Sequence, residues 1–441
     1  MKNIKSYSNT FKHIGWKTLL LVMALSLLFY TIALAASGDL DPTFSGDGKL
    51  TTDIGGWKDR ANAVAVQSDG RIVAVGDHYN AAGDKYDFAV VRYRSGGALD
   101  NTFSGDGKLT TNFGGKDQAK DVAIQSNGRI VVAGHACDAS WFCDLGVARY
   151  NSNGSLDTTF SGDGRVTVDF GDLNNGAGNH GLAIQTDGKI VIAGFMDNGS
   201  DYDFAVYRLN PNGSLDPTFH GDGKLNFGFG SGRYDIGMDL AIQSNGKMVV
   251  VGETCDAGAS NCNFAIARVN ADGTLDTTFS GDGKTVTNFG ADDHGFAVAI
   301  QSNGRIVAVG TSDGPSDDYF AVARYTSNGN LDASFHADGK VLTNLSPGLS
   351  NGGRDLAIQS DGKIVVAGYA HGPISLEFGL IRYNQNGSLD NTFEVDGKLT
   401  TNFGGDDYGT AIALQGDGRI IVAGKAYTGA DWDFALVRYL P

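Results

Sequence analysis

Acidic side chains at a fixed spacing are the first residues of this sequence that could bind a ligand. Five Asp residues each stand eight positions before a recurring Gln: Asp59, Asp117, Asp235, Asp293 and Asp407. Carboxylate oxygens are ligands that Ca²⁺ prefers, so we expect a calcium site if these side chains ring the mouth of a channel. The alternative is that each Asp bonds to the backbone of its own turn. Ala177 and Asn351 hold this position in two further copies.

Aromatic residues lie among acids and amides in a second group of variable segments. Four of them are candidate ligand-binding residues, because an aromatic face beside polar groups suits a sugar: Tyr79, Trp141, Tyr369 and Tyr427. Tyr86, Tyr202 and Trp432 stand at a position that holds Cys in two other copies. We expect those three to be structural plugs.

Catalytic chemistry has little support. The His residues after position 35 fall in different units without the spacing of metal ligands: His78, His135, His180, His220, His294, His336 and His371. No Gly-x-Ser-x-Gly elbow or phosphate loop occurs. Two carboxylates meeting across a channel could still act on a glycoside. An extracellular hydrolase or lyase therefore stays open as an alternative to a non-enzymatic protein.

The four Cys form two local pairs. Cys137 and Cys143 bracket one short polar segment, and Cys255 and Cys262 bracket another. Two disulfides are the prediction, because local pairs suit an oxidising compartment. Zinc binding is the alternative, but the spacing is not Cys-x-x-Cys and His135 is the only nearby His.

The N-terminal segment predicts export. Lys residues precede an apolar run from Leu19 to Leu34 that contains no charge, and Ala33-Leu34-Ala35 has the pattern of a signal-peptidase site. We expect residues 1–35 to be a signal peptide and 36–441 the mature, secreted or cell-surface protein. A retained membrane anchor is the alternative. The sequence contains no second apolar run, so we expect no stable membrane span after cleavage of the signal peptide.

Charge and composition exclude two classes of protein. The net charge is −16, and loss of residues 1–35 would remove four Lys and leave −20. Such an acidic protein repels phosphate backbones, so we expect no nucleic-acid partner. Of the 50 acidic residues only Glu253, Glu377 and Glu394 are Glu, and the 64 Gly favour turns. This balance disfavours a helical protein.

One repeat accounts for the rest of the chain. Leu-Asp-x-x-Phe recurs at steps of 56 to 60 residues, starting at Leu40, Leu99, Leu156, Leu215, Leu275, Leu331 and Leu389. Each unit predicts four short strands. In the second copy these are 121–125, 128–134, 145–150 and 164–170. An Asp-Gly or Asn-Gly dipeptide between the first two strands of each unit predicts a type I′ hairpin turn.

Seven four-stranded units predict an all-β, seven-bladed β-propeller. The chain has a fourth-type strand near its start (GKLTTDI, 48–54) and ends soon after a third-type strand (FALVRY, 434–439). We expect the N-terminal strand to join the last blade and close the ring. An open solenoid is the alternative, but it would need distinct caps at both ends.

The unit AIQSDGKIVVAG…FGLIRYNQNGSLDNTF (357–393) resembles the delta-60 repeat, a family of secreted or surface bacterial propeller proteins. The resemblance covers all seven copies. It implies the fold and an extracellular location, and it supplies no catalytic or binding residues to transfer.

Several residue types recur in register. An Arg of the third strand and the Asp of Leu-Asp are expected to form a bidentate ion pair in every unit; seven anion sites are the alternative. The Arg residues are Arg92, Arg149, Arg208, Arg268, Arg324, Arg382 and Arg438, and the Asp residues are Asp41, Asp100, Asp157, Asp216, Asp276, Asp332 and Asp390.

Taken together, the sequence predicts a secreted, monomeric, non-enzymatic propeller that binds an extracellular carbohydrate or protein through variable loops on one rim. Calcium is the one cofactor the residues suggest. A structural surface protein stabilised by calcium is a further alternative to the enzyme.

Overall fold

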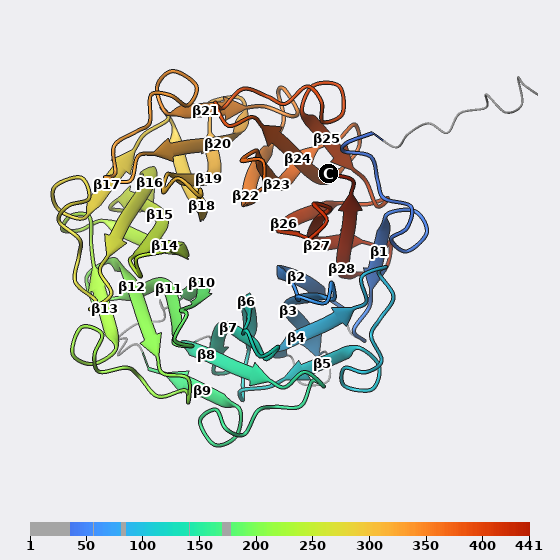
Figure 1. Ribbon diagram of the computed structural model, residues 1–441, viewed down its shortest axis with the longest axis horizontal. Helices are drawn as coiled ribbons and strands as arrows, with labels where there is room; N and C mark the ends of the chain where they lie inside the picture. The colour runs from blue at the N-terminus through green and yellow to red at the C-terminus, as the bar shows by residue number, and fades with distance from the viewer. Residues whose placement is uncertain (1–35, 56, 81–84, 141, 170–177) are drawn as a thin grey trace, which may run out of the picture.

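Seven four-stranded antiparallel units surround a central axis (Figure 1). The computed structural model describes residues 36–55, 57–80, 85–140, 142–169 and 178–441, with only the backbone for 178–180. Within these residues all regular elements are β-strands, 28 in number. This confirms the all-β prediction. No helix in the described part of the chain is long and apolar enough to cross a bilayer.

The strands are grouped here as blades 1 to 7, each given from the innermost strand outward. Blade 1 contains β2 (Asp59–Val66), β3 (Ile72–Asn80), β4 (Lys85–Tyr93) and β5 (Lys108–Thr111). Blade 2 contains β6 (Gln118–Ile124), β7 (Ile130–Cys137), β8 (Cys143–Tyr150) and β9 (Arg165–Val168). Blade 3 contains β10 (Gly178–Ile184), β11 (Ile190–Asp197), β12 (Tyr202–Leu209) and β13 (Lys224–Phe227). Blade 4 contains β14 (Tyr234–Ile242), β15 (Met248–Asp256), β16 (Ser260–Val269) and β17 (Lys284–Thr287). Blade 5 contains β18 (Asp292–Ile300), β19 (Ile306–Asp313), β20 (Asp318–Tyr325) and β21 (Lys340–Thr343). Blade 6 contains β22 (Asn351–Ile358), β23 (Ile364–His371), β24 (Leu376–Tyr383) and β25 (Lys398–Thr401). Blade 7 contains β26 (Asp407–Leu414), β27 (Ile420–Tyr427), β28 (Trp432–Tyr439) and β1 (Lys49–Thr52).

Blade 7 is built from both ends of the chain. β1 pairs antiparallel with β28, with Lys49 opposite Val437 and Thr52 opposite Phe434. This is the strand pairing predicted from the two chain ends. Blades 3 and 4 are joined by a single parallel bridge between Tyr202 and Tyr234, and otherwise form separate four-stranded sheets.

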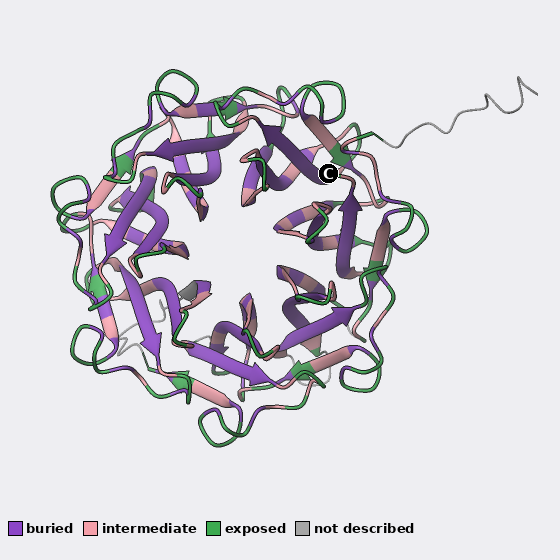
Figure 2. Cartoon of the chain, viewed as in Figure 1, coloured by how far each residue is buried: buried purple, intermediate pink, exposed green. Residues whose placement is uncertain are grey.

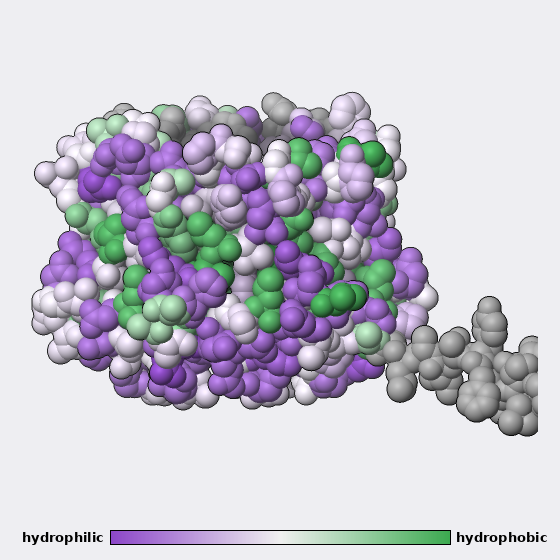
Figure 3. Space-filling model, turned by 90° about the horizontal axis from the view of Figure 1, so that it is seen from above, coloured by the Kyte–Doolittle hydropathy of each residue, from purple (hydrophilic) through white to green (hydrophobic). Residues whose placement is uncertain are grey.

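The hydrophobic core lies between blades. One cluster packs Val75 and Phe88 of blade 1 against Val122 and Ile130 of blade 2, and an equivalent cluster joins blade 7 to blade 1. Figure 2 shows the strands mostly buried and the connections exposed. The outer wall mixes hydrophobic and hydrophilic side chains in separate patches (Figure 3).

The hairpin between the first two strands of a blade differs from the predicted type I′ turn. In blade 2 the Gly128 N–H donates to Gln125 O at 2.8 Å, and the Gln125 N–H donates to Arg129 O at 2.8 Å, which encloses a three-residue loop. Gly128 has φ +81°, whereas Asn127 is absent from the described non-Gly residues with positive φ. Asn127 instead accepts the Arg129 N–H through Oδ1 at 3.0 Å. The Asn therefore serves as a side-chain acceptor, and the Gly alone takes the left-handed conformation.

Each innermost strand contains a β-bulge, which places one extra residue out of register with its neighbour. The register shifts lie between residues 61 and 63, 119 and 121, 179 and 181, 237 and 239, 295 and 297, 353 and 355, and 409 and 411. The bulge brings a backbone carbonyl against the second strand, where a Gly stands. A Cβ at Gly252 would lie 1.9 Å from Ile236 O, and one at Gly310 would lie 1.8 Å from His294 O. Gly is therefore required there by close backbone approach.

Candidate functional site

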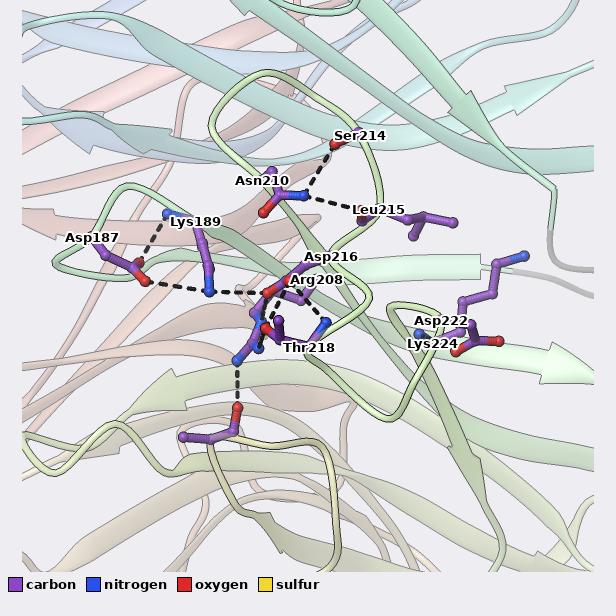
Figure 4. Close-up of polar contacts among 11 residues, drawn as sticks. Asp187, Lys189, Arg208, Asn210, Ser214, Leu215, Asp216, Thr218, Asp222 and Lys224 are labelled. Atoms are coloured by element: carbon purple, nitrogen blue, oxygen red, sulfur yellow. Dashed lines mark hydrogen bonds and ion pairs between the residues drawn. The ribbon is translucent and has the colours of Figure 1, made fainter.

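The repeated Arg–Asp pair is structural. In blade 3 (Figure 4) Arg208 Nε donates to Asp216 Oδ2 at 2.7 Å, and Nη2 donates to Thr218 Oγ1 at 3.1 Å. Lys189 Nζ lies 3.1 Å from the same Asp216 oxygen. Arg208 Nη1 donates to Ala271 O of blade 4. One carboxylate thus takes two cations, and the Arg ties its blade to the next.

The same contact recurs in all seven blades, with Nε to Oδ2 distances of 2.6 to 2.9 Å. The predicted pairs are therefore present, but the contact is through Nε alone rather than bidentate, because Nη2 is directed to a hydroxyl as in Thr218. Burial opposes the ionisation of Asp216, but hydrogen bonds from Thr218, Lys189 and Arg208 outweigh it and hold its pKa well below the usual range. The protein's own groups satisfy these carboxylates.

The five Asp of the calcium prediction are also bound to backbone groups. Their exposed fractions are 0 to 1%. Each accepts the N–H of a residue in the connection before its strand, at 2.6 to 2.7 Å: Asp59 from Ile54, Asp117 from Phe113, Asp235 from Phe229, Asp293 from Phe289 and Asp407 from Phe403. Burial raises the pKa of Asp117 and Asp407 to about 6. This geometry is that of the turn alternative, since none of the five lies on an open surface. Calcium binding by them stays a prediction.

One acidic group among the described residues has metal-like spacing. Asp53, Asp59 and Asp433 each place a carboxylate oxygen within 4.8 Å of the others, at the junction of blades 7 and 1. His78 Nδ1 lies 2.8 Å from Asp59 Oδ1, and this hydrogen bond raises the pKa of His78. The protein itself thereby supplies a hydrogen-bond partner for one of the three acids.

The Cys pairs form disulfides, as predicted. Cys137 is bonded to Cys143 and Cys255 to Cys262, and no Cys of the described chain is free. Each bond joins the second and third strands of its blade, in blades 2 and 4.

The candidate aromatics do not gather at one place. Tyr79 packs against Tyr86 at 5.0 Å between ring centroids, and Tyr427, 39% exposed, packs against Trp432 at 5.7 Å. Both pairs are cross-strand neighbours within a blade. Tyr369 lies in β23 of blade 6 and packs on Tyr408 of blade 7. Trp141 lies outside the described residues, as does the predicted signal segment 1–35.

The bulge residues of the innermost strands line one axial cavity of about 260 Å³. Six of them do so, one each from blades 1, 2, 4, 5, 6 and 7: Asn62, Lys120, Met238, Phe296, Arg354 and Thr410. The seventh bulge residue is His180, whose side chain is not described. Each of the six is half-buried between neighbours that belong to the sheet or core. A bulge re-aims a side chain in this way and is frequent beside functional sites.

These bulge residues differ in every blade. They are Asn, Lys, His, Met, Phe, Arg and Thr in blade order, at a backbone position that is equivalent in all seven. The position that follows the Gly of each second strand is just as diverse: Asp77, His135, Phe195, Glu253, Thr311, Tyr369 and Lys425. We name the six described bulge residues the axial ring. The symmetry that the Arg–Asp pairs keep in all seven blades is thus lost at the axis.

A cationic and aromatic row extends the axial ring across blades 5 to 7. The Arg354 guanidinium lies 4.0 Å over the Phe296 ring and 5.2 Å over that of Tyr369. Tyr369 packs on Tyr408 at 5.5 Å, and Lys425 Nζ lies 4.4 Å over the ring of Tyr408. Such contacts are stabilising by roughly 0.5–2 kcal/mol each.

A polar pair stands beside this row. His294 Nδ1 lies 2.5 Å from Glu253 Oε2, and its Nε2 lies 3.6 Å from Asp313 Oδ2. The hydrogen bond to Glu253 raises the pKa of His294. The His294 ring also stacks near Phe296, with 6.4 Å between centroids.

Three acids of the cavity wall follow bulge residues in blades 2, 4 and 6. Asp239 accepts the N–H of Leu240 at 2.7 Å and that of Val298 in blade 5 at 2.8 Å. Asp121 and Asp355 repeat these contacts toward blades 3 and 7. Burial and repulsion from Asp355 raise the pKa of Asp239 to about 7. Burial raises the pKa of Asp355 to about 6. These acids connect blades in pairs.

A family model identifies the family to which this chain belongs. The model of the DUF5122 beta-propeller, a domain of unknown function, matches residues 67–103, 125–160, 185–219, 243–279, 301–335, 359–393 and 415–441. The chain belongs to this family. The seven matched segments confirm the seven-copy propeller repeat recognised in the sequence. A search of curated proteins finds no match.

Several solved structures are similar to this DUF5122 propeller at low identity. A protein of unknown function from Dyadobacter fermentans is 12% identical, with 89% of this chain and 100% of that chain covered and a TM-score of 0.46. The polysaccharide lyase Uly1 is 10% identical, with coverages of 92% and 97% and a TM-score of 0.49. Trypanosoma rangeli sialidase in complex with sialic acid is 13% identical, with coverages of 91% and 60% and a TM-score of 0.42. No function is transferred from likenesses this distant.

The sequence reasoning missed the axial ring because it sought variation in loops. The signal was present as a position five residues before the recurring Gln that never repeats a residue type in seven copies. The Gly in each second strand was a second signal, since Gly inside a strand marks a bulge or a close backbone approach.

Proposed function

We propose that this DUF5122 propeller is a binding protein that holds a carbohydrate at the axial ring. The observation that carries the proposal is the diversity of the axial ring at one equivalent backbone position. Packing alone would favour one residue type there, as it does for the Ala two residues before each recurring Gln. A cavity of about 260 Å³ accepts a sugar unit or a chain end. This size favours a carbohydrate over a folded protein partner.

Export and ring closure belong to the same proposal. Residues 1–35 would direct secretion and be removed, and the two disulfides are compatible with an extracellular site. The pairing of β1 with β28 would close the ring and fix the seven bulges around one axis. The mature protein is then a monomer that does not bind nucleic acid.

Glycan binding by the full chain tests this function. The variants Phe296→Thr and Tyr369→Thr place in blades 5 and 6 the residues found at equivalent positions of blades 7 and 5, Thr410 and Thr311. We expect each to weaken binding of a glycan panel at least about tenfold, the effect of losing one stacking or packing contact of roughly 1.4 kcal/mol. Trp57→Ala, at an aromatic side chain that is 69% exposed, is the control. Wild-type affinity in Phe296→Thr would exclude the axial ring as the binding site, and wild-type affinity in Tyr369→Thr would exclude a contribution from the neighbouring aromatic row.

An enzyme is the second candidate, favoured by one observation. His294, bonded to Glu253 and stacked near Phe296 on an innermost strand, offers an imidazole whose pKa that bond raises. Such a group could donate a proton to a leaving oxygen of a polysaccharide. The assay is release of new reducing ends or unsaturated sugar ends by the full chain. Product formed by wild type and lost in His294→Gln would establish the enzyme, and none from wild type would leave the binding protein.

A further inference from the structure

Two cations of the axial ring lack an acidic partner in a protein that is strongly acidic. Lys120 and Arg354 line the same cavity. Among the described residues, neither cation has a carboxylate oxygen within 4.0 Å. In contrast, the recurring Arg of every blade core forms an ion pair with an Asp. Lys120 Nζ donates to Gln118 Oε1 at 3.0 Å, and Arg354 rests on the rings of Phe296 and Tyr369.

Nearby acids form no direct ion pair with these cations. Asp77 acts on Lys120, and Asp313 and Glu253 on Arg354, only through space. Asp121 and Asp355 are the next residues in the chain, but each uses both oxygens for backbone N–H groups, at 2.7 to 2.8 Å. Arg60 shows the contrast, since it stands two residues before a bulge and its Nε pairs with Asp77 Oδ2 at 2.9 Å. Asp77 Oδ1 accepts from Asn62 at 2.6 Å, so this acid is also satisfied.

An unpaired, poorly hydrated cation is costly, and the cost is recovered when a partner of opposite charge arrives. Burial lowers the pKa of both Lys120 and Arg354, which reports that cost. The axial acids Asp121, Asp239 and Asp355 oppose an anion only in part, because burial raises their pKa and their oxygens are directed at the backbone.

We propose that Lys120 and Arg354 bind an anionic group of the carbohydrate, a carboxylate or a sulfate ester, so that the ligand of the axial ring is an acidic glycan. This inference rests on the proposed function and specifies its ligand class. Arg354 presents a planar donor fork suited to either group, and Lys120 a point charge. Phe296 and Tyr369 then contact the sugar ring beside the anionic group.

The test uses matched glycans on the full chain. Polygalacturonate is compared with its methyl ester, and dextran sulfate with dextran, by calorimetry or biolayer interferometry. We expect at least about tenfold tighter binding of one anionic member than of its neutral counterpart. The pair that shows the preference distinguishes carboxylate from sulfate. The preference for the anionic glycan over its neutral counterpart should decrease with added salt, because salt screens contacts between charges.

The variants Lys120→Met and Arg354→Met introduce the residue that blade 4 carries at the same bulge, Met238, so the fold accepts it. Each should weaken binding of the anionic glycan about tenfold to a hundredfold, and that of its neutral counterpart by a clearly smaller factor. Arg94→Met is the charge-matched control, since its side chain is 60% exposed. Unfolding temperatures of all variants are measured alongside.

The outcomes separate the two proposals. Equal affinity for neutral and anionic glycans, or an unchanged affinity in both axial Met variants, would overturn the acidic-glycan inference and leave a carbohydrate-binding ring. Failure of wild type to bind any glycan would overturn the proposed function itself.

Discussion

Removing one carboxylate of the repeated ion-pair network should destabilise the propeller by several kcal/mol. Asp390, in blade 6, is 3% exposed, and its Oδ2 lies 2.7 Å from Arg382 Nε and 3.1 Å from Lys363 Nζ. Burial opposes its ionisation, but the bonds from Thr392 and the two cations hold its pKa at about 2. Asp390→Asn removes the charge and leaves a buried Arg382 uncompensated.

The magnitude follows from the pKa and from the cost of the orphaned cation. A folded pKa of about 2 against about 3.8 in the unfolded chain contributes about 2.4 kcal/mol at pH 7. The uncompensated Arg382 brings the expected loss to about 3–5 kcal/mol. Because unfolding of about 400 residues carries an entropy of about 0.85 kcal/mol/K, the melting temperature should fall by about 4–6 °C.

Thermal unfolding of wild type and variant at pH 7 and pH 3 is the assay. A depressed folded pKa gives stability that is present above about pH 4 and lost as the pH falls toward 2. The wild-type contribution therefore drops to about 1.3 kcal/mol at pH 3, and the difference between the proteins should shrink. Asp396→Asn is the control, since Asp396 in the same blade is 61% exposed and pairs loosely with Lys398 at 3.7 Å. A melting temperature of Asp390→Asn within 1 °C of that control would refute the reasoning.

Four further predictions follow from the same structure. The free energy of unfolding should fall as the pH rises from about 4 through the folded pKa of Asp239 of about 7, and Asp239→Asn should flatten this part of the profile while it lowers stability at pH 4, because its amide nitrogen replaces one of the two oxygens that accept backbone N–H groups; melts at pH 4 and pH 8 check the sign. Gly252→Ala should abolish folding or lower the melting temperature strongly, since the new Cβ would lie 1.9 Å from Ile236 O, whereas Gly416→Ala, with no atom within 4 Å, should be neutral by circular dichroism. Deletion of residues 36–54 should leave little folded protein by size exclusion, because it exposes the edge of β28 and removes the Asp41 partner of Arg438; a stable monomer of unchanged melting temperature would contradict ring closure. Calcium or EDTA should shift the melting temperature if the five buried Asp bind the ion (Asp59, Asp117, Asp235, Asp293 and Asp407), and an unmoved transition would exclude them as calcium ligands.

Much of the fold was accessible from the sequence because it is local and repeated. Hairpin dipeptides, β-branched runs and a constant repeat length each follow from backbone preferences. Because the unit occurs seven times, an atypical residue in one copy does not obscure the pattern. The second strand was predicted to end at its Gly, for instance at Gly134, yet β7 continues to Cys137. Gly134 stands inside the strand because a bulge approaches it, which is a relation between two strands and not a local preference.

The candidate site was less accessible for a related reason. Carboxylates such as Asp117 look like free ligands in a sequence, and only the fold shows the backbone N–H that each one accepts. Conversely, Lys120 and Arg354 look like ordinary surface charges of a strand. Their convergence on one cavity from blades 2 and 6 depends on ring geometry that no spacing encodes.

The bulge also has a consequence for how such a protein can change over time. The bulge residue is out of register with its neighbouring strand, so its side chain takes no part in strand pairing. In blades 1 and 7 it bonds to the next blade instead, through Asn62 Nδ2 to Ala119 O at 2.7 Å and Thr410 Oγ1 to Ala61 O at 2.8 Å. The diversity of residue types found there shows that one scaffold accepts different side chains at this position. New recognition properties can then arise by point substitution or by duplication of one unit, and the same positions are the natural sites for a designed library.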